Sequence, residues 1–122
     1  MDILGITIWR EARSEGLAGM NAVAHVIANR GAASPHNAWP SDVEQVCLQP
    51  WQFSCWNLTD PQRNLYPKDG DPQYAIAQRC PMMGDDPTSG ATAYFDVSIL
   101  PPPWAHPEDF TAQIGRLKFY KL

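Results

Sequence analysis

The chain has 122 residues, 44% of them hydrophobic and 18% charged, which is enough for one compact domain with a hydrophobic core and too few for two. A formal net charge of -4, a pI near 5.1 and the absence of a Lys/Arg cluster exclude an electrostatic surface for DNA or RNA. No apolar stretch approaches the length of a membrane span, so stable membrane insertion is not expected. We therefore predict a single domain over residues 1–122, acting as a monomer.

The N-terminal residues lack the basic start and apolar core of a secretion signal, which predicts synthesis in the cytoplasm. Cys47, Cys55 and Cys80 allow at most one internal disulfide, for example Cys47 with Cys55 or Cys80 in an oxidising compartment. The cysteines and histidines show neither C-x-x-C nor H-E-x-x-H spacing. We therefore expect no metal site and no cofactor.

The hydrophobic spacing predicts a first helix over residues 3–13, carrying Glu11 near its end and interrupted at Gly16. Glu11 follows a run of apolar residues that includes Trp9. A carboxyl group partly desolvated against a tryptophan keeps its proton to higher pH, as a general acid for a sugar ether bond must. The alternative is an ordinary salt bridge from Glu11 to Arg10 or Arg13 on a solvated helix face.

A second helix is predicted over residues 17–30, with Gly31 as its C-cap. Its small residues Ala22, Ala24 and Ala28 would let another helix approach closely. We expect this helix to form the centre of the core.

Residues 31–40 have loop composition, after which Ser41 and Glu44 form an S-x-x-E capping box that opens a short helix ending near Leu48. Residues 50–67 show no sustained period. They are interpreted as a surface excursion packed by its own aromatic side chains.

Asp71 followed by proline is typical of a helix start, and this helix should end at Cys80. A turn-rich segment then leads to residues 91–95, which have strand propensity and predict a small hairpin or an isolated strand. Residues 101–103 are three prolines, and residues 114–120 are expected to pack back onto the domain.

Five tryptophans are many for so short a chain. Sugar rings stack well on indole faces, so some of these tryptophans are candidates for lining a groove. The alternative, which we assume for about half of them, is that they fill the core.

Four segments matter together: residues 9–15 (W-R-E-A-R-S-E), 52–56 (Q-F-S-C-W), 90–95 (G-A-T-A-Y-F) and 114–120 (I-G-R-L-K-F-Y). With them the chain resembles the SleB/CwlJ-type cell wall hydrolases, a spore-cortex lytic family that also has phage members. The corresponding family blocks read Y-G-E-A-R-G-E, Q-F-S, G-A-T-H-Y-Y and I-G-x-x-x-F-Y. The resemblance spans nearly the whole chain, in order.

The resemblance implies that Glu11 is the catalytic acid. It also implies substrate-binding residues in the middle and third blocks: Gln52, Phe53, Ser54, Trp56, Thr92 and Tyr94. Glu15 is a possible secondary catalytic residue; alternatively it orients the loop or raises the Glu11 pKa as a like charge. Ala93 departs from the family, which often has histidine there, so proton transfer through the third block is in doubt.

The implied fold is mainly α-helical with a small β element, an α+β, lysozyme-like single domain. The implied activity is cleavage of peptidoglycan glycan strands at the β-1,4 bond between N-acetylmuramic acid and N-acetylglucosamine. A lytic transglycosylase needs one carboxylate and forms a 1,6-anhydro product, whereas an N-acetylmuramidase needs a positioned water and usually a partner carboxylate. We expect the transglycosylase, acting as a phage or prophage endolysin that reaches the wall after release through a membrane lesion; a piece of a longer protein would look identical.

Two alternatives stay open. Ser54-Cys55-Trp56 is similar to the S-C-W of papain-like sites, so Cys55 could be the nucleophile of a peptidoglycan amidase or peptidase, with His106 as its base. A catalytically silent glycan-binding module would keep the tryptophans without depending on Glu11.

Overall fold

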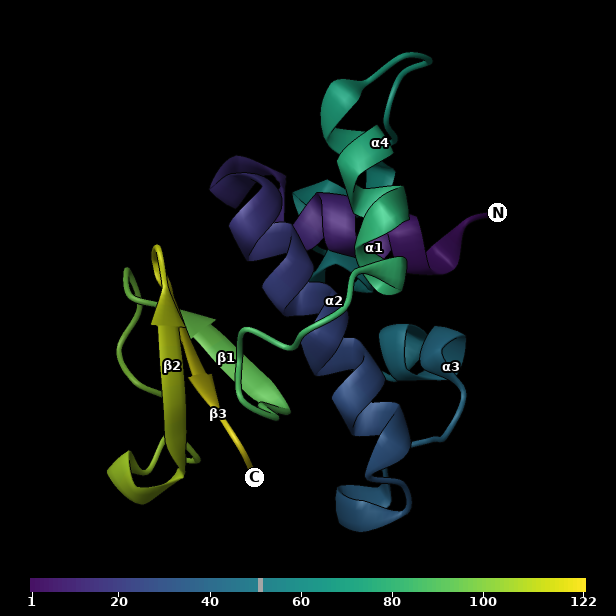
Figure 1. Cartoon of the computed structure of the whole chain (residues 1–122). Helices are drawn as coiled ribbons and strands as arrows, with labels where there is room; N and C mark the ends of the chain where they lie inside the picture. The colour runs from purple at the N-terminus through teal and green to yellow at the C-terminus, as the bar shows by residue number, and fades with distance from the viewer. Residues whose placement is uncertain (51) are drawn as a thin grey trace.

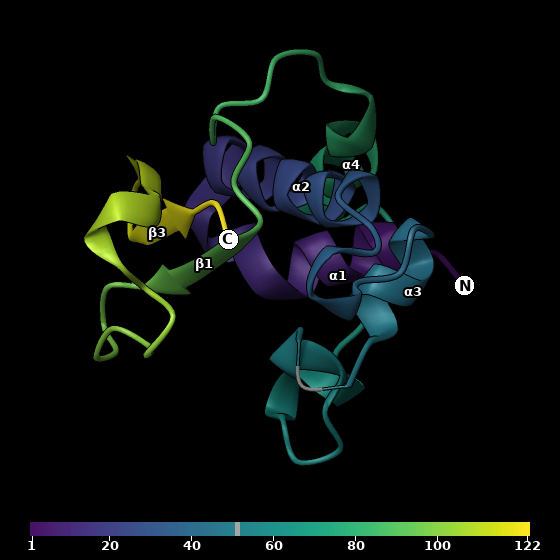
Figure 2. The same cartoon turned by 90° about the horizontal axis from the view of Figure 1, so that it is seen from below.

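The computed structural model describes residues 1–50 and 52–122 (Figures 1 and 2). Its helices are α1 (Ile3–Ala12), α2 (Gly16–Ala32), α3 (Val43–Leu48) and α4 (Pro72–Arg79), and its strands are β1 (Ala93–Asp96), β2 (Phe110–Ile114) and β3 (Leu117–Tyr120). Short 3-10 helices connect them: Arg13–Glu15, His36–Ala38, Ser54–Trp56, Pro61–Asn64, Cys80–Met82 and Pro107–Asp109. The long α2 lies between the small sheet on one side and α1, α3 and α4 on the other (Figure 1).

Helix α1 begins at a capped turn and ends close to the predicted place. The Asp2 side chain accepts a hydrogen bond from the Gly5 amide at 3.0 Å, which satisfies one of the free donors of the first turn. Gly16 has a φ of 70°, in the region that favours glycine, so the chain changes direction there before α2. The predicted interruption is confirmed, and Glu11 is the next-to-last residue of α1.

Helix α2 forms the centre of the core, as predicted, because its Ala22 and Ala24 are buried. Ala28 is exposed, so its small side chain does not serve the expected close approach. Gly31 lies inside the helix and is not its C-cap, which is Ala33. The physical reason is packing: a Cβ at Gly31 would lie 3.0 Å from the Ser41 carbonyl oxygen.

The caps of the two shorter helices differ in how well they were predicted. Helix α3 is capped by Asp42, whose side chain accepts from the Glu44 amide at 3.0 Å, so the prediction of Ser41 as the cap was wrong by one residue. Both side chains can cap a helix, and the backbone direction decides between them. Asp71 caps α4 as predicted, accepting from the amides of Gln73 and Tyr74.

The sheet is larger than predicted. Its strands are antiparallel in the order β1-β3-β2, with Tyr94 of β1 opposite Phe119 of β3. Residues 114–120, expected only to pack against the domain, instead form most of a hairpin that turns at Gly115, where φ is 57°. The pairing of β1 with β3 joins Ala93 to Tyr120 and leaves little local signal, whereas the β2–β3 hairpin is local and was missed although its turn contains Gly115.

The core joins the helices and the sheet. Buried residues of α1 and α2, such as Ile8 and Val23, form one cluster with Leu117 and Phe119 of β3. Within the described part of the chain, no helix combines the length and apolar character of a membrane span.

Candidate active site

The site is built where the end of α1 meets the edge strand β1. The Tyr94 hydroxyl donates a hydrogen bond of 2.6 Å to Oε1 of Glu11, across 83 positions of sequence. The Tyr94 ring is tilted against Phe119 of β3 at a centroid distance of 5.7 Å, which fixes its direction. The first and third sequence blocks therefore meet at one carboxyl group.

Burial raises the pKa of Glu11 above its ordinary value, because the charged form is desolvated. The Tyr94 hydroxyl partly offsets this by stabilising the carboxylate, while the negative charge of Asp60 adds to the increase. Smaller lowering effects come from the Cys55 thiol and the Arg30 charge. The net direction is upward, as a proton donor at this position needs.

Neither neighbouring arginine forms the simple salt bridge that was the alternative for Glu11. Arg13 lies over the Trp9 ring at 4.1 Å and donates to the carbonyl oxygens of Trp9 and Arg10. Among the described residues, the ion pairs are His25–Asp86 and Arg116–Asp96, and neither involves Glu11. The desolvated interpretation of Glu11 is the one that agrees with this geometry.

Arg10 anchors the middle block to α1. Its buried guanidinium lies between the rings of Trp56 and Tyr66, at 4.4 and 4.7 Å. It donates hydrogen bonds to three backbone carbonyls, those of Cys55, Arg63 and Leu65. The excursion over residues 50–67 is thus held by its aromatics, as predicted, but around an arginine from α1; Trp51 lies outside the described residues.

The middle block supplies two buried supports and two exposed side chains. Phe53 is buried beneath the Arg30 guanidinium, and Trp56 is half-buried with its Nε1 donating to the Thr7 hydroxyl at 2.8 Å. Gln52 and Ser54 are exposed. Of these four predicted substrate-binding residues, Gln52 and Ser54 are therefore the ones with polar groups open to a ligand.

Arg30, near the end of α2, is a site residue that the sequence prediction missed. Its Nε donates to the Thr92 carbonyl at 2.5 Å, and its Nη1 lies 3.4 Å from Oε1 of Gln52. Thr92 is buried, and its hydroxyl accepts from the Leu122 amide at 3.0 Å. Arg30 thus connects the middle and third blocks. Its position in a helical pattern suggested only a helix end, although a buried arginine is unusual enough to mark a site.

Glu15 lies in the 3-10 helix Arg13–Glu15 that follows α1. Its carboxylate touches the turn between β2 and β3, since a Cβ built on Gly115 would lie 2.9 Å from Oε2 of Glu15. The main influences on the Glu11 pKa are its burial and the groups of Tyr94, Asp60, Cys55 and Arg30. This placement favours the orienting role over direct participation.

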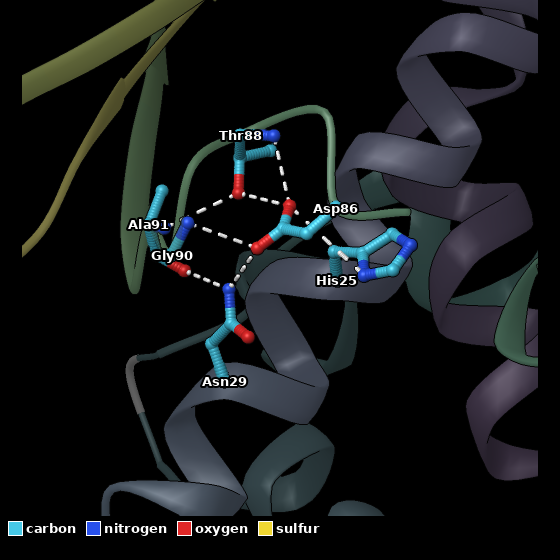
Figure 3. Close-up of polar contacts among 6 residues, drawn as sticks. All are labelled: His25, Asn29, Asp86, Thr88, Gly90 and Ala91. Atoms are coloured by element: carbon cyan, nitrogen blue, oxygen red, sulfur yellow. Dashed lines mark hydrogen bonds and ion pairs between the residues drawn. The ribbon is translucent and has the colours of Figure 1, made fainter. Parts of the chain in front are cut away.

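A second polar cluster holds the loop that leads into β1 (Figure 3). Asp86 accepts from the amide and hydroxyl of Thr88, at 2.8 and 2.6 Å, and from the Gly90 amide at 2.9 Å. Asn29 of α2 donates both to Asp86 and to the Ala91 carbonyl, at 2.9 and 2.8 Å. These bonds lower the Asp86 pKa to about 2 and tie the start of the third block to α2.

The cysteines do not support a thiol nucleophile. All three are free and buried, so the disulfide considered above is not formed in this structure. Burial raises the pKa of the Cys55 thiol, which keeps it protonated and unreactive, whereas His106 is exposed. Within the described residues, no group of three His, Cys, Asp or Glu side chains is placed to hold a metal ion.

The fold and site together define an α+β protein with a partly desolvated glutamic acid between a helix end and a small sheet. A family model described as Cell Wall Hydrolase matches residues 14–120, and the chain belongs to that family. Glu11 lies just before the matched residues.

The chain is similar to a spore cortex-lytic enzyme of Halalkalibacterium halodurans, with 30% identity over 95% of the chain. It spans about a third of that relative's length, 33%. Among solved structures, it is similar to the catalytic domain of the Bacillus cereus SleB protein, with 27% identity, a TM-score of 0.74, and coverage of 98% of this chain and 88% of the other. The catalytic domain of the germination-specific lytic transglycosylase SleB from Bacillus anthracis matches with 27% identity, a TM-score of 0.75, and coverage of 98% and 92%. The predicted α+β, lysozyme-like fold and the family resemblance are confirmed.

Proposed function

We propose that this chain cleaves peptidoglycan glycan strands at the β-1,4 bond between N-acetylmuramic acid and N-acetylglucosamine, as a lytic transglycosylase. Glu11 is the single catalytic acid and base, Gln52, Ser54 and Tyr94 border the glycan, and the buried Thr92 supports this edge through its bond to Arg30. The observation that carries the proposal is a desolvated Glu11 with the Tyr94 hydroxyl 2.6 Å from its Oε1. Membership of the cell wall hydrolase family and the similarity to a lytic transglycosylase support it.

The mechanism needs two proton transfers, one from Glu11 to the leaving oxygen and one from the attacking hydroxyl to Glu11. Protonated Glu11 donates to the bridging oxygen as the C1–O bond of the muramic acid breaks and positive charge develops at C1. The C6 hydroxyl of the same sugar then attacks C1, and the Glu11 carboxylate takes the hydroxyl proton. The products are a 1,6-anhydromuramic end and a free N-acetylglucosamine end, and Glu11 is again protonated. Tyr94 holds the carboxyl in place throughout.

The direct test is Glu11→Gln, which keeps the shape of the side chain and removes its titrating proton. We expect release of soluble fragments from purified sacculi to fall by about 10²–10⁴-fold, the usual contribution of a general acid. Glu44→Gln, at an exposed position of α3, is the matched control and should retain activity. Glu15→Gln should lose little if that residue only orients its loop. Lysis by the Glu11→Gln variant at the wild-type rate would refute the proposal.

The reaction type is read from the products. Mass spectrometry of the released muropeptides should give anhydro ends, lighter by one water than hydrolytic ends. Reducing muramic acid ends would instead assign a muramidase, with a water activated by a second carboxylate. Asp60 is the candidate for that role, because its charge acts on Glu11.

We further propose that the protein acts as an endolysin, which would be made in the cytoplasm and reach the wall after membrane permeabilisation. The phage members of the family that the four blocks resemble support this role. Expression in a bacterial host should leave cells intact until chloroform or a pore-forming protein opens the membrane, and should then cause lysis. Cells making the Glu11→Gln variant should not lyse. Rapid lysis before permeabilisation would argue against release through a lesion.

A further inference from the structure

A pocket of about 440 Å³ shares Arg30 and Gln52 with the candidate active site. Arg30, near the end of α2, and two indoles, Trp39 and Trp104, line it. Gln52 and Ala93 complete the wall nearest the middle and third blocks. The lining comes from several segments of the chain, and Arg30 is the charged side chain among these described residues.

Arg30 is 7% exposed, which is unusual for a cation without an ion-pair partner. The ring of Phe53 lies 4.9 Å from its guanidinium carbon and the ring of Trp39 lies 5.7 Å away. Its Nε and Nη1 donate to neutral oxygens, and no carboxylate of the described residues forms an ion pair with it. Among the described residues, Nη2 donates no hydrogen bond, and Arg30 is one of the residues that line the pocket.

A desolvated guanidinium that faces a pocket gains most from a bound anion. Arginine presents parallel N–H donors that match the two oxygens of a carboxylate, and the low local dielectric strengthens the pair. Indole walls fit the apolar faces of a sugar ring. A sugar that carries a carboxylate satisfies both features.

N-acetylmuramic acid is such a sugar, because its C3 oxygen carries a lactyl group that ends in a carboxylate or in the stem peptide. Building on the proposed function, we infer that the Arg30 pocket binds a carboxylate on the lactyl arm of the muramyl residue and thereby places that sugar at Glu11. Arg30 bonds to the Thr92 carbonyl and Glu11 accepts from the Tyr94 hydroxyl, so both groups border the same short segment, residues 92–94.

The small side chain of Ala93 leaves space in the pocket for the lactyl arm. It lies on the pocket wall at the position where the resembling family often has histidine, and its methyl group leaves space that a ring would occupy. Enlarging this side chain should therefore narrow the pocket without removing a hydrogen bond of Arg30.

The first experiment changes the substrate and leaves the protein intact. Wild-type protein is assayed on peptide-bearing sacculi and on bare glycan strands, each native and after carbodiimide amidation of carboxylates. We expect amidation to raise KM by about tenfold with kcat within twofold, the size of one lost charged hydrogen bond. An increase in KM on bare strands alone identifies the lactyl carboxylate as the bound group. An increase on peptide-bearing strands alone identifies a carboxylate of the stem peptide. Equal KM on native and amidated forms of both substrates would overturn the inference.

Variants then test whether the change in KM on amidation comes from the Arg30 pocket. Arg30→Lys keeps the charge and loses the paired donors, so it should raise KM on native substrate and abolish the difference between native and amidated forms. Ala93→Leu should do the same while leaving Arg30 in place, which covers the case in which Arg30→Lys fails to fold. Arg116→Lys, an exposed pair with Asp96, is the matched control and should behave as wild type. A wild-type preference for native substrate in Ala93→Leu would count against the pocket as its source.

A binding measurement separates this inference from the proposed activity. The Glu11→Gln protein is titrated with N-acetylmuramic acid, its methyl ester and N-acetylglucosamine while the indole N–H signals are followed by NMR. Tighter binding of the free acid, lost in Ala93→Leu, supports the pocket even if no glycan is cleaved. Cleavage without any preference for the free acid would retain the proposed function and reject the pocket.

Discussion

At the scale of the residue, the proton affinity of Glu11 results from a competition between burial and hydrogen bonding. Desolvation raises its pKa, and the Tyr94 hydroxyl is the largest influence in the opposite direction. The same hydroxyl holds Oε1 at 2.6 Å, so Tyr94 affects both where the carboxyl lies and when it releases its proton. The effect of Tyr94 on the position of the carboxyl and its effect on the Glu11 pKa can be separated by measuring the rate as a function of pH.

Tyr94→Phe should lower the maximum rate by about 10–100-fold, since a charged hydrogen bond that positions the acid is lost. The same change should raise the Glu11 pKa, because the lost bond stabilised the carboxylate. A general acid must be protonated to act, so the alkaline limb of the pH–rate profile should move to higher pH. Tyr66→Phe, on the exposed ring beside Arg10, is the control and should leave the limb in place. A shift to lower pH would contradict this account of Glu11.

At the scale of the element, the site depends on how β1 is set against α2. The loop before β1 folds around Asp86, which gathers two amides and a hydroxyl from its own loop and the amide group of Asn29 from α2 (Figure 3). Because Thr92 and Tyr94 follow directly, this cluster decides whether β1 presents them to Arg30 and Glu11.

Asp86→Ala should reduce the free energy of unfolding by roughly 2 kcal/mol near pH 6, through several lost hydrogen bonds to a charged group. The folded Asp86 pKa is lowered to about 2 from an ordinary value of 3.8. The stabilisation is therefore fully present above pH 3.8 and is lost as pH falls toward 2, so the difference between variant and wild type should shrink in acid. Urea unfolding at several pH values measures it, with the exposed neighbour in Asp85→Ala as control. A difference independent of pH would mean that the carboxylate charge contributes nothing.

At the scale of the whole molecule, the helices and the sheet share one core. Phe119 of β3 is fully buried in the cluster formed by α1 and α2, and the Tyr94 ring packs against it. We therefore predict one cooperative unfolding unit over residues 1–122 that behaves as a monomer in solution.

Phe119→Ala should lower the free energy of unfolding by about 3–5 kcal/mol, the usual cost of emptying a buried phenylalanine site. Helical circular dichroism and tryptophan fluorescence should change in one transition, because both layers lose the same core. Phe110→Ala, on a ring that is 45% exposed, should cost much less. Two separate transitions would show that the sheet and helices unfold independently, and light scattering at the mass of a dimer would reject the monomer.

The features that could be predicted from the sequence are those set by neighbours along the chain. The spacing of apolar residues determined α1 and α2, and Asp71 with its proline determined the start of α4. Glu11 could be singled out because the apolar residues around it, including Trp9, are its neighbours in the sequence.

Only the tertiary structure decided which residues contact Glu11. Its bond to Tyr94 spans 83 positions, and Arg30 reaches Thr92 across 62, so neither contact has a signature within a helix turn or a strand. The pairing of β1 with β3, and the space at Gly31 for the Ser41 carbonyl, were missed for the same reason. Periodicity and capping act over a few residues. Burial arises only once distant segments have packed together, and it is burial that raises the Glu11 pKa and encloses Arg30, which has no ion pair among the described residues.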